Sequence, residues 1–160
     1  MTGDVERFEQ ILAELGKLLG SLGDLAQHLV LVGGQVPALV AREKVGPRPL
    51  AIRTSTGVSV VRPYSLEPDL LFDVEGAGFL ADRLPDVLRA NGFLPVRSYR
   101  WRKDLGEFAM EIDFFAPPGT QPPTVMTPLA SAERVLAGPN RLRVSTAAGT
   151  FEIAVPNPVA

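Results

Sequence analysis

A glycine pair in the first quarter of the chain separates a strand-like apolar run from a segment with helical spacing. Residues 28–32 form a short continuous apolar run, which is typical of a buried strand. Gly33-Gly34 ends the run, and residues 35–42 then resume a helical pattern. Pro37 is tolerated only in the first turn of that helix, where its missing amide donor has no helical partner to lose. The segment therefore predicts a strand, a glycine turn and a helix, and so a fold that contains both a sheet and helices.

Two further helices are predicted on either side of this unit. Apolar residues recur at three- and four-residue spacing over 4–22, with Asp4 as the expected cap and Gly23 just past the end. A later helix is expected over 79–90, where Pro85 marks a kink or a late start. Asn91-Gly92 closes it.

The remaining segments predict strands and loops. Strands are expected over 69–74, 96–102 and 108–115, and a hairpin over 141–155 that turns at Ala148-Gly149. Residues 45–63 should form an irregular excursion with a short strand or hairpin, and residues 117–128, with five prolines, a loop. The sequence thus predicts an α+β (α/β-like) fold, a mixed β-sheet flanked by helices.

Composition limits the classes of protein that fit. A chain of 160 residues with 46% hydrophobic content predicts one domain over 1–160. The chain has 16 basic and 18 acidic residues, so its overall charge does not favour binding of nucleic acid over the whole surface. Any contact with nucleic acid must therefore be local. The chain has no cysteine, which excludes disulfides and thiol chemistry and fits a reducing, cytoplasmic location. No segment predicts membrane insertion or targeting.

Three acids stand in or beside apolar strands, where core packing does not call for them. Glu67 and Asp69 are two residues apart, so they share one face of a strand, and Asp113 follows in an apolar strand that also carries Glu111 on its face. Burying an unpaired carboxylate costs several kcal/mol. Oxygen ligands of this kind suit Mg²⁺ or Mn²⁺, and two such ions can serve nucleotidyl transfer. Pro68 places Glu67 at the strand boundary rather than within the ladder.

Gly33, Gly34 and Gln35 form the second half of the predicted site. Unobstructed backbone amides at a helix N-terminus bind phosphate, although the same glycines also suit a simple strand-to-helix turn. A basic run, residues 97–103, offers phosphate contacts with Trp101 as a stacking surface, or else a solvated strand face.

Four motifs in order resemble a known family, the nucleotidyltransferase-fold proteins related to the AbiEii abortive-infection toxins in the DNA polymerase beta-like superfamily. The family pattern is an apolar strand ending in Gly-Gly before a helix, then Thr-x-Asp-apolar-Asp-apolar, then a helix ending near Gly-Phe, then apolar-Asp-apolar. The matching segments here are residues 29–34, 65–70, 91–93 and 112–114. Together the motifs span about residues 25–117.

The resemblance implies a nucleotidyltransferase-like core and a metal-dependent transfer of a nucleoside monophosphate from a triphosphate to an acceptor hydroxyl. Glu67, Asp69 and Asp113 would be the catalytic, metal-binding acids for Mg²⁺ or Mn²⁺, and Asp113 would activate the acceptor. The acceptor would be a tRNA, a protein or a small molecule, and the chain would be the toxin of a toxin–antitoxin pair with an antitoxin partner.

Departures from the family pattern keep a second hypothesis open. The first acid is Glu67, a proline separates the acids, and Gln35 stands where relatives carry a small hydroxyl or apolar residue. A catalytically degenerate binding or interaction module is therefore the alternative. Relatives also continue beyond a segment like residues 153–158 into a helical region, so the resemblance implies a fragment or a minimal form.

Overall fold

The computed structural model describes residues 2–46, 50–62, 65–97 and 99–157. Residues 158–160, which include the end of the last predicted turn, lie outside the described residues. The helices are α1 (Thr2–Leu22), η1 (Gly23–His28), α2 (Gln35–Val45), α3 (Val74–Ala77), η2 (Gly78–Arg83), α4 (Leu84–Ala90) and α5 (Ala132–Leu136). The strands are β1 (Leu29–Val32), β2 (Leu50–Arg53), β3 (Ser59–Arg62), β4 (Asp69–Phe72), β5 (Leu94–Arg97), β6 (Arg100–Asp104), β7 (Ala109–Ala116), β8 (Thr127–Pro128), β9 (Asn140–Thr146) and β10 (Gly149–Val155).

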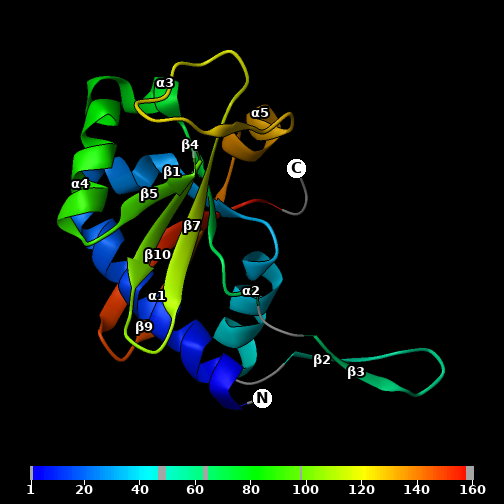
Figure 1. Ribbon diagram of the computed structural model, residues 1–160. Coiled ribbons are helices and arrows are strands. Elements are labelled where there is room, and N and C mark those ends of the chain that lie inside the picture. The colour runs from blue at the N-terminus through cyan, green and yellow to red at the C-terminus, as the bar shows by residue number, and fades with distance from the viewer. Residues whose placement is uncertain (1, 47–49, 63–64, 98, 158–160) are drawn as a thin grey trace.

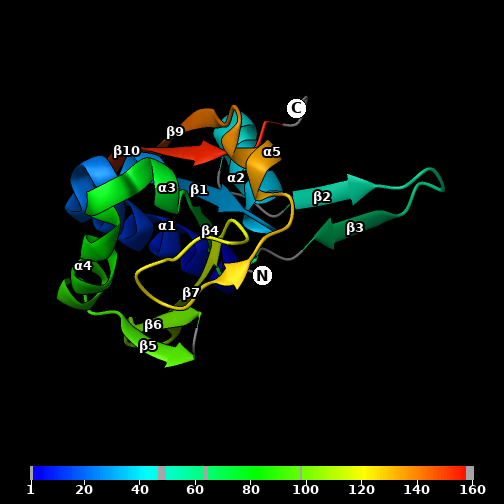
Figure 2. The same ribbon diagram turned by 90° about the horizontal axis from the view of Figure 1, so that it is seen from above.

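One sheet organises the body of the molecule. Seven strands follow the order β5-β6-β7-β4-β1-β10-β9, and β8 pairs with β7 beside this path. Strands β1 and β10 run parallel, as do β4 and β7, whereas β1 and β4 are antiparallel. The sheet is therefore mixed, with helices packed against it, and the predicted α+β fold is confirmed (Figures 1 and 2).

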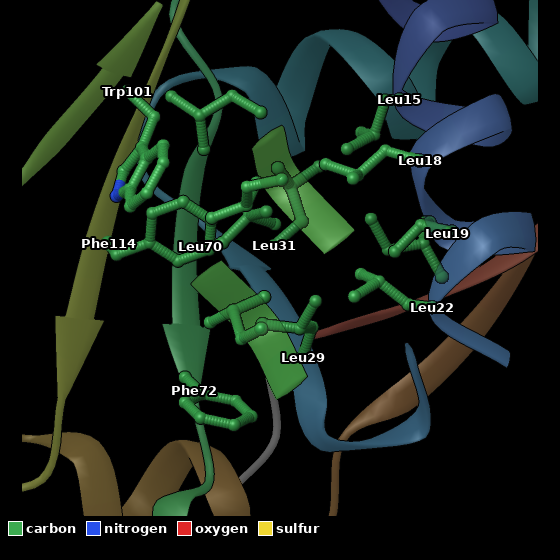
Figure 3. Close-up of a cluster of buried hydrophobic side chains, with 14 of the residues drawn as sticks. Leu15, Leu18, Leu19, Leu22, Leu29, Leu31, Leu70, Phe72, Trp101 and Phe114 are labelled. Carbon is green, nitrogen blue, oxygen red and sulfur yellow. The ribbon is translucent and has the colours of Figure 1, made fainter. Parts of the chain in front are cut away.

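The main hydrophobic core lies on one face of the sheet, beneath α1 and α4. Every third or fourth residue of α1 points into it, because this spacing places apolar side chains on one side of a helix. Alternate residues of the central strands meet them, since side chains i and i+2 share a sheet face. Figure 3 shows this layer as Leu15, Leu18, Leu19, Leu22, Leu29, Leu31, Leu70, Phe72, Trp101 and Phe114.

The opposite face of the sheet has a much smaller apolar cover. Val30, Val32, Leu71 and Ala154 are its buried sheet residues, and Ala132 of α5 packs against them. Asp69 shares this face with Leu71, and Asp113 shares it with Phe115, because each pair is two residues apart on one strand. The acids therefore lie on the thinly covered face, while their strands remain anchored in the main core.

An ion-pair cluster fixes helix α2 against the body. The Nε of Arg42 lies 2.8 Å from Oε1 of Glu9 on α1, and its Nη1 lies 2.6 Å from Glu43. The same guanidinium donates to the carbonyl of Ser145 on β9. The Arg42 side chain is 9% exposed, whereas Glu9 and Glu43 are 27% and 26% exposed, so these pairs are only partly shielded from water. They tie α2 to both α1 and β9.

The excursion between α2 and β4 contains the predicted hairpin. Strands β2 and β3 pair antiparallel, with Arg53 opposite Ser59, and make no ladder with the main sheet. The hairpin projects away from the body in both views (Figures 1 and 2).

Several local predictions are wrong. Helix α1 already begins at Thr2, so Asp4 lies in its first turn and is not the cap. The single strand expected over 96–102 is two antiparallel strands, β5 and β6, and Ser98 of that range lies outside the described residues. Strand β4 ends at Phe72, because the Asp73 side chain accepts from the amide of Gly76 and caps α3.

Other differences concern helix starts and short elements. The helix expected over 79–90 is a 3₁₀ turn, η2, followed by α4, and Pro85 lies in the first turn of α4, which confirms the late start. Strand β8 was missed within the proline-rich segment, and α5 was missed after it. None of the helices in the described part of the chain combines the length and apolar character needed to cross a membrane.

Candidate functional site

Polar side chains line up across three neighbouring strands on the thinly covered face. Asp69 of β4 lies directly opposite Asp113 of β7 in parallel register. Asp113 in turn lies opposite Arg100 of β6 in antiparallel register. Residues directly opposite one another on neighbouring strands point to the same sheet face, so Arg100, Asp113 and Asp69 form one row. The backbone holds this row, since the Asp113 amide donates to the Pro68 carbonyl at 3.0 Å.

The glycine turn after β1 continues the row on the other side of Asp69. Val32, the last residue of β1, lies opposite Asp69, so Gly33 follows immediately beside this carboxylate. Gly33 has φ +78°, and a Cβ at this position would overlap the Oδ2 atom of Asp69. Glycine suits the backbone conformation here, and a side chain would also force the carboxylate to move.

Asp69 is the carboxylate with the strongest electrostatic perturbation. Burial, followed by repulsion from Asp113 and Glu67, raises its pKa from 3.8 to about 6, while Arg100 opposes this rise. Both causes disfavour the charged form of an acid. Asp69 is thus the member of the row whose negative charge is least compensated.

Arg100 contacts three of the four acids around it. Its Nε and Nη2 lie 2.6 Å and 2.9 Å from the two oxygens of Asp113, a bidentate pair. Its Nη1 lies 3.0 Å from Glu111, and its Nη2 lies 3.4 Å from Glu67. Hydrogen bonding to Asp113 raises the pKa of Arg100 further above its ordinary value, so this side chain is a permanent cation in the row.

Glu67 lies where the proline was expected to put it. Strand β4 begins at Asp69, so Glu67 precedes the ladder, and its side chain is 54% exposed against 12% for Asp113. The prediction of a boundary position is confirmed. Glu67 still turns toward the row, because it reaches the guanidinium of Arg100.

The N-terminus of α2 is tied to the loop that carries the acids. Gln35 is 1% exposed, and its Nε2 donates to the Ser65 carbonyl at 2.8 Å. A Cβ on Gly34 would lie 3.3 Å from the Ser65 Cβ, so the turn and the loop are in close contact. The Oε1 of Gln35 is buried and, within the part of the chain that the structure describes, has no hydrogen-bond partner. A buried acceptor of this kind is costly unless a donor reaches it.

The acids supply the type of ligand atom that a divalent cation binds, but Arg100 already pairs with two of them, Glu67 and Asp113. All the candidate ligands are oxygens, which Mg²⁺ and Mn²⁺ prefer. Among the described residues, however, no three His, Cys, Asp or Glu side chains are grouped so that they could hold one ion. The guanidinium forms ion pairs with Glu67 and Asp113 but not with Asp69. The register of Asp69 with Asp113 and the unpaired buried Oε1 of Gln35 are consistent with a bound divalent cation. The metal site itself stays a prediction.

The stacking role considered for Trp101 is wrong. Trp101 is 1% exposed and lies in the main core beside Leu70 and Phe114 (Figure 3). The guanidinium of Arg89 lies 5.4 Å from the ring centroid. Strand alternation explains the difference, because Arg100 points to the acid face and its neighbour must point to the core.

Arg100 is the site residue that the sequence reasoning did not single out. It was grouped with the other basic residues of 97–103 as a solvated face or a phosphate contact. The feature that could have identified Arg100 is the tight turn between β6 and β7, where the amide of Leu105 donates to the carbonyl of Phe108. Pairing counted outward from that turn brings Arg100 opposite Asp113.

No family model, curated protein or solved structure matches the chain.

Proposed function

We propose that the protein is a metal-dependent nucleotidyltransferase, which moves a nucleoside monophosphate from a nucleoside triphosphate to an acceptor hydroxyl. The observation that carries the proposal is the register of Asp69 and Asp113 on parallel strands, beside the glycine turn that opens α2. An acid pair next to a helix N-terminus supplies both parts that the reaction needs, ligands for a divalent cation and amides for phosphate.

Each residue has a role that follows from its position. Asp69 and Asp113, with Glu67 as the outer ligand, would hold Mg²⁺ or Mn²⁺. When bound, the ion would neutralise charge on the triphosphate and on the leaving pyrophosphate. Gly33, Gly34 and Gln35 would bind phosphate through backbone amides at and just before the start of α2, whose positive dipole end favours anions.

The proposed reaction is an in-line displacement at the α-phosphorus. The acceptor oxygen bonds to this phosphorus, the bond to the bridging oxygen breaks, and pyrophosphate leaves. Asp113 would take the hydroxyl proton, since it is the least exposed acid of the row and is fixed by its strand. In the toxin form of the proposal, the acceptor is a tRNA or a protein, and an antitoxin partner restrains the activity in the cytoplasm.

Thermal shift with Mg²⁺ and each of the four triphosphates tests binding. The intact chain should be stabilised by at least one triphosphate in the presence of Mg²⁺, and Asp69→Asn and Asp113→Asn should lose most of this shift. Glu67→Gln should retain part of it, because this side chain is half exposed and outside the ladder. Asp82→Asn, at an exposed position of η2, is the matched control and should behave as the intact chain does. Absence of any triphosphate-dependent shift in the intact chain contradicts the proposal.

Transfer is tested with triphosphates labelled at the α-phosphate. Label should enter total tRNA or protein with the intact chain and not with Asp69→Asn. Binding of triphosphate that is equal with Mg²⁺ and with a chelator, without any transfer, would favour the second candidate function.

That second candidate is a metal-free binding module with the same fold. The Arg100 network favours it, because a guanidinium already neutralises Asp113 and part of Glu67 without an external cation. A module of this kind should bind its partner equally well with Mg²⁺ and with a chelator. The enzyme should require the ion.

A further inference from the structure

Arg100 lies among the same carboxylates that the proposed metal ion would use. Its guanidinium engages both oxygens of Asp113 and one oxygen each of Glu67 and Glu111. We propose that Arg100 is a resident counter-cation that competes with the divalent ion for Asp113 and Glu67, and that ion binding displaces its side chain from the row. This inference rests on the proposed function.

The contact geometry makes simultaneous occupation unfavourable. Both oxygens of Asp113 lie within 2.9 Å of guanidinium nitrogens. A divalent ion on the same carboxylate would lie a few ångströms from a fixed positive charge, and like charges at that separation repel strongly away from bulk water. The ion and the guanidinium must therefore exchange rather than share Asp113.

The side chain is also able to leave. Arg100 is anchored to Asp113 only through its guanidinium, and its side chain is 21% exposed, so part of it already contacts solvent. Its backbone stays in the ladder between β6 and β7, opposite Asp113. Displacement therefore needs the guanidinium to leave Asp113, Glu67 and Glu111 as the side chain rotates, but it needs no change in the sheet.

Charge balance shows why both cations suit this place. Glu67, Glu111 and Asp113 contact the one guanidinium, and Asp69 adds its charge without a contact to it. Four carboxylates around one arginine leave net negative charge, which a second positive group would neutralise. A divalent ion carries twice the charge of the arginine that it would replace.

A purely structural ion pair predicts the opposite result for an arginine variant. If Arg100 only orients Asp113, its removal lets the carboxylates move apart and weakens ion binding. If Arg100 competes, its removal frees the ligands and strengthens ion binding. The sign of the change in affinity distinguishes the two roles.

Binding of Mn²⁺, followed by the loss of its free-ion electron paramagnetic resonance signal, provides the test without any assay of activity. Arg100→Gln should bind Mn²⁺ about ten- to hundredfold more tightly than the intact chain, since the ion no longer breaks charge-assisted hydrogen bonds. Arg83→Gln, which removes the same charge at an exposed position of η2, should bind as the intact chain does. Adding Asp69→Asn to Arg100→Gln should abolish the gain.

Arg100→Lys provides the second variant in case Arg100→Gln folds poorly. It keeps the charge and loses the bidentate fork, so its Mn²⁺ affinity should lie between those of the intact chain and the glutamine variant. Equal or weaker binding by both variants, with clear binding by the intact chain, overturns the inference and leaves the proposed function in place. No Mn²⁺ binding by the intact chain or by either variant overturns both.

Discussion

Asp69 and Asp113 lie directly opposite one another on adjacent parallel strands, although 43 residues separate them in the chain. Their backbones are fixed by the ladder of β4 and β7, so their mutual repulsion cannot be relieved by moving the chain apart. The repulsion appears instead in Asp69, whose pKa rises to about 6. The candidate site is thus a place where the fold holds like charges together.

Gly33→Ala should destabilise the protein more than an alanine at another left-handed glycine. An alanine at φ +78° is strained, and its Cβ would also overlap the Asp69 carboxylate. Gly119 has φ +79° with nothing within 4 Å of an added Cβ, so Gly119→Ala measures the backbone strain alone. We expect strain of about 1–3 kcal/mol at either site. Overlap should add about 1–3 kcal/mol at Gly33 only.

Urea denaturation of both variants measures the two free energies of unfolding. Combining Gly33→Ala with Asp69→Ala should recover most of the extra loss, because the overlapping carboxylate is gone. Equal losses for the two glycine variants would show that Asp69 does not press against the turn.

Asp69→Asn should change how stability depends on pH. Asp69 ionises near 3.8 in the unfolded chain and near 6 in the folded protein. Between these values the folded state holds a proton that the unfolded state releases, so the stability contributed by Asp69 is complete below pH 3.8 and is lost as pH rises through about 6. The asparagine variant does not lose this stability, because its side chain does not ionise.

The free energy of unfolding of Asp69→Asn, minus that of the intact chain, should therefore rise from pH 4 to pH 7 by about 1–2 kcal/mol. The subtraction removes the contributions of other acids, such as Glu14, whose pKa is lowered and whose contribution has the opposite sign. Asp82→Asn, on an exposed position of η2, should give a flat difference. A flat difference for Asp69→Asn as well would contradict the raised pKa.

Arg42→Met should loosen helix α2 and lower stability. The variant leaves Glu9 and the Ser145 carbonyl without their common donor in a partly shielded position. We expect a loss of about 1–2 kcal/mol, measured by urea denaturation, because water can still reach the acid that is left without its partner. Lys44→Met on the exposed side of the same helix is the control and should change stability by less than about 0.5 kcal/mol.

A double-mutant cycle of Arg42→Met with Glu9→Gln isolates the pair. Their effects should be non-additive by about 1 kcal/mol or more, since the two residues are in direct contact. Additive effects would mean that Ser145 or Glu43, rather than Glu9, holds the helix.

Trp101 should report on the core and not on ligand stacking. It is the only tryptophan of the chain, so its fluorescence is unambiguous. Emission should be blue-shifted and poorly quenched by acrylamide in the folded protein, and both properties should be lost on unfolding. Trp101→Ala should cost about 3–5 kcal/mol, as expected for a large side chain that is 1% exposed. Strong quenching in the native protein would contradict the burial.

Much of the fold follows from local pattern. The helical spacing of α1, the apolar run of β1, the late start of α4 and the hairpin of β9 and β10 were predicted because each depends on neighbouring residues. The split of 96–102 into two strands was missed, because alternation looks the same in one strand and in two. Helix α5 has only five residues, too few to show a helical period.

The sequence by itself determined the chemical character of the candidate site. Acids in or beside apolar strands, and a glycine pair between a strand and a helix, are visible in residue order alone, because they depend on residue type and spacing. Only the tertiary structure decided which charges meet. Strand pairing places Arg100 opposite Asp113 and Asp113 opposite Asp69, and register between strands depends on packing across the whole sheet. The core beneath these strands fixes the register, and so it fixes which carboxylates are neutralised and that Asp69 is left without a contact to the guanidinium.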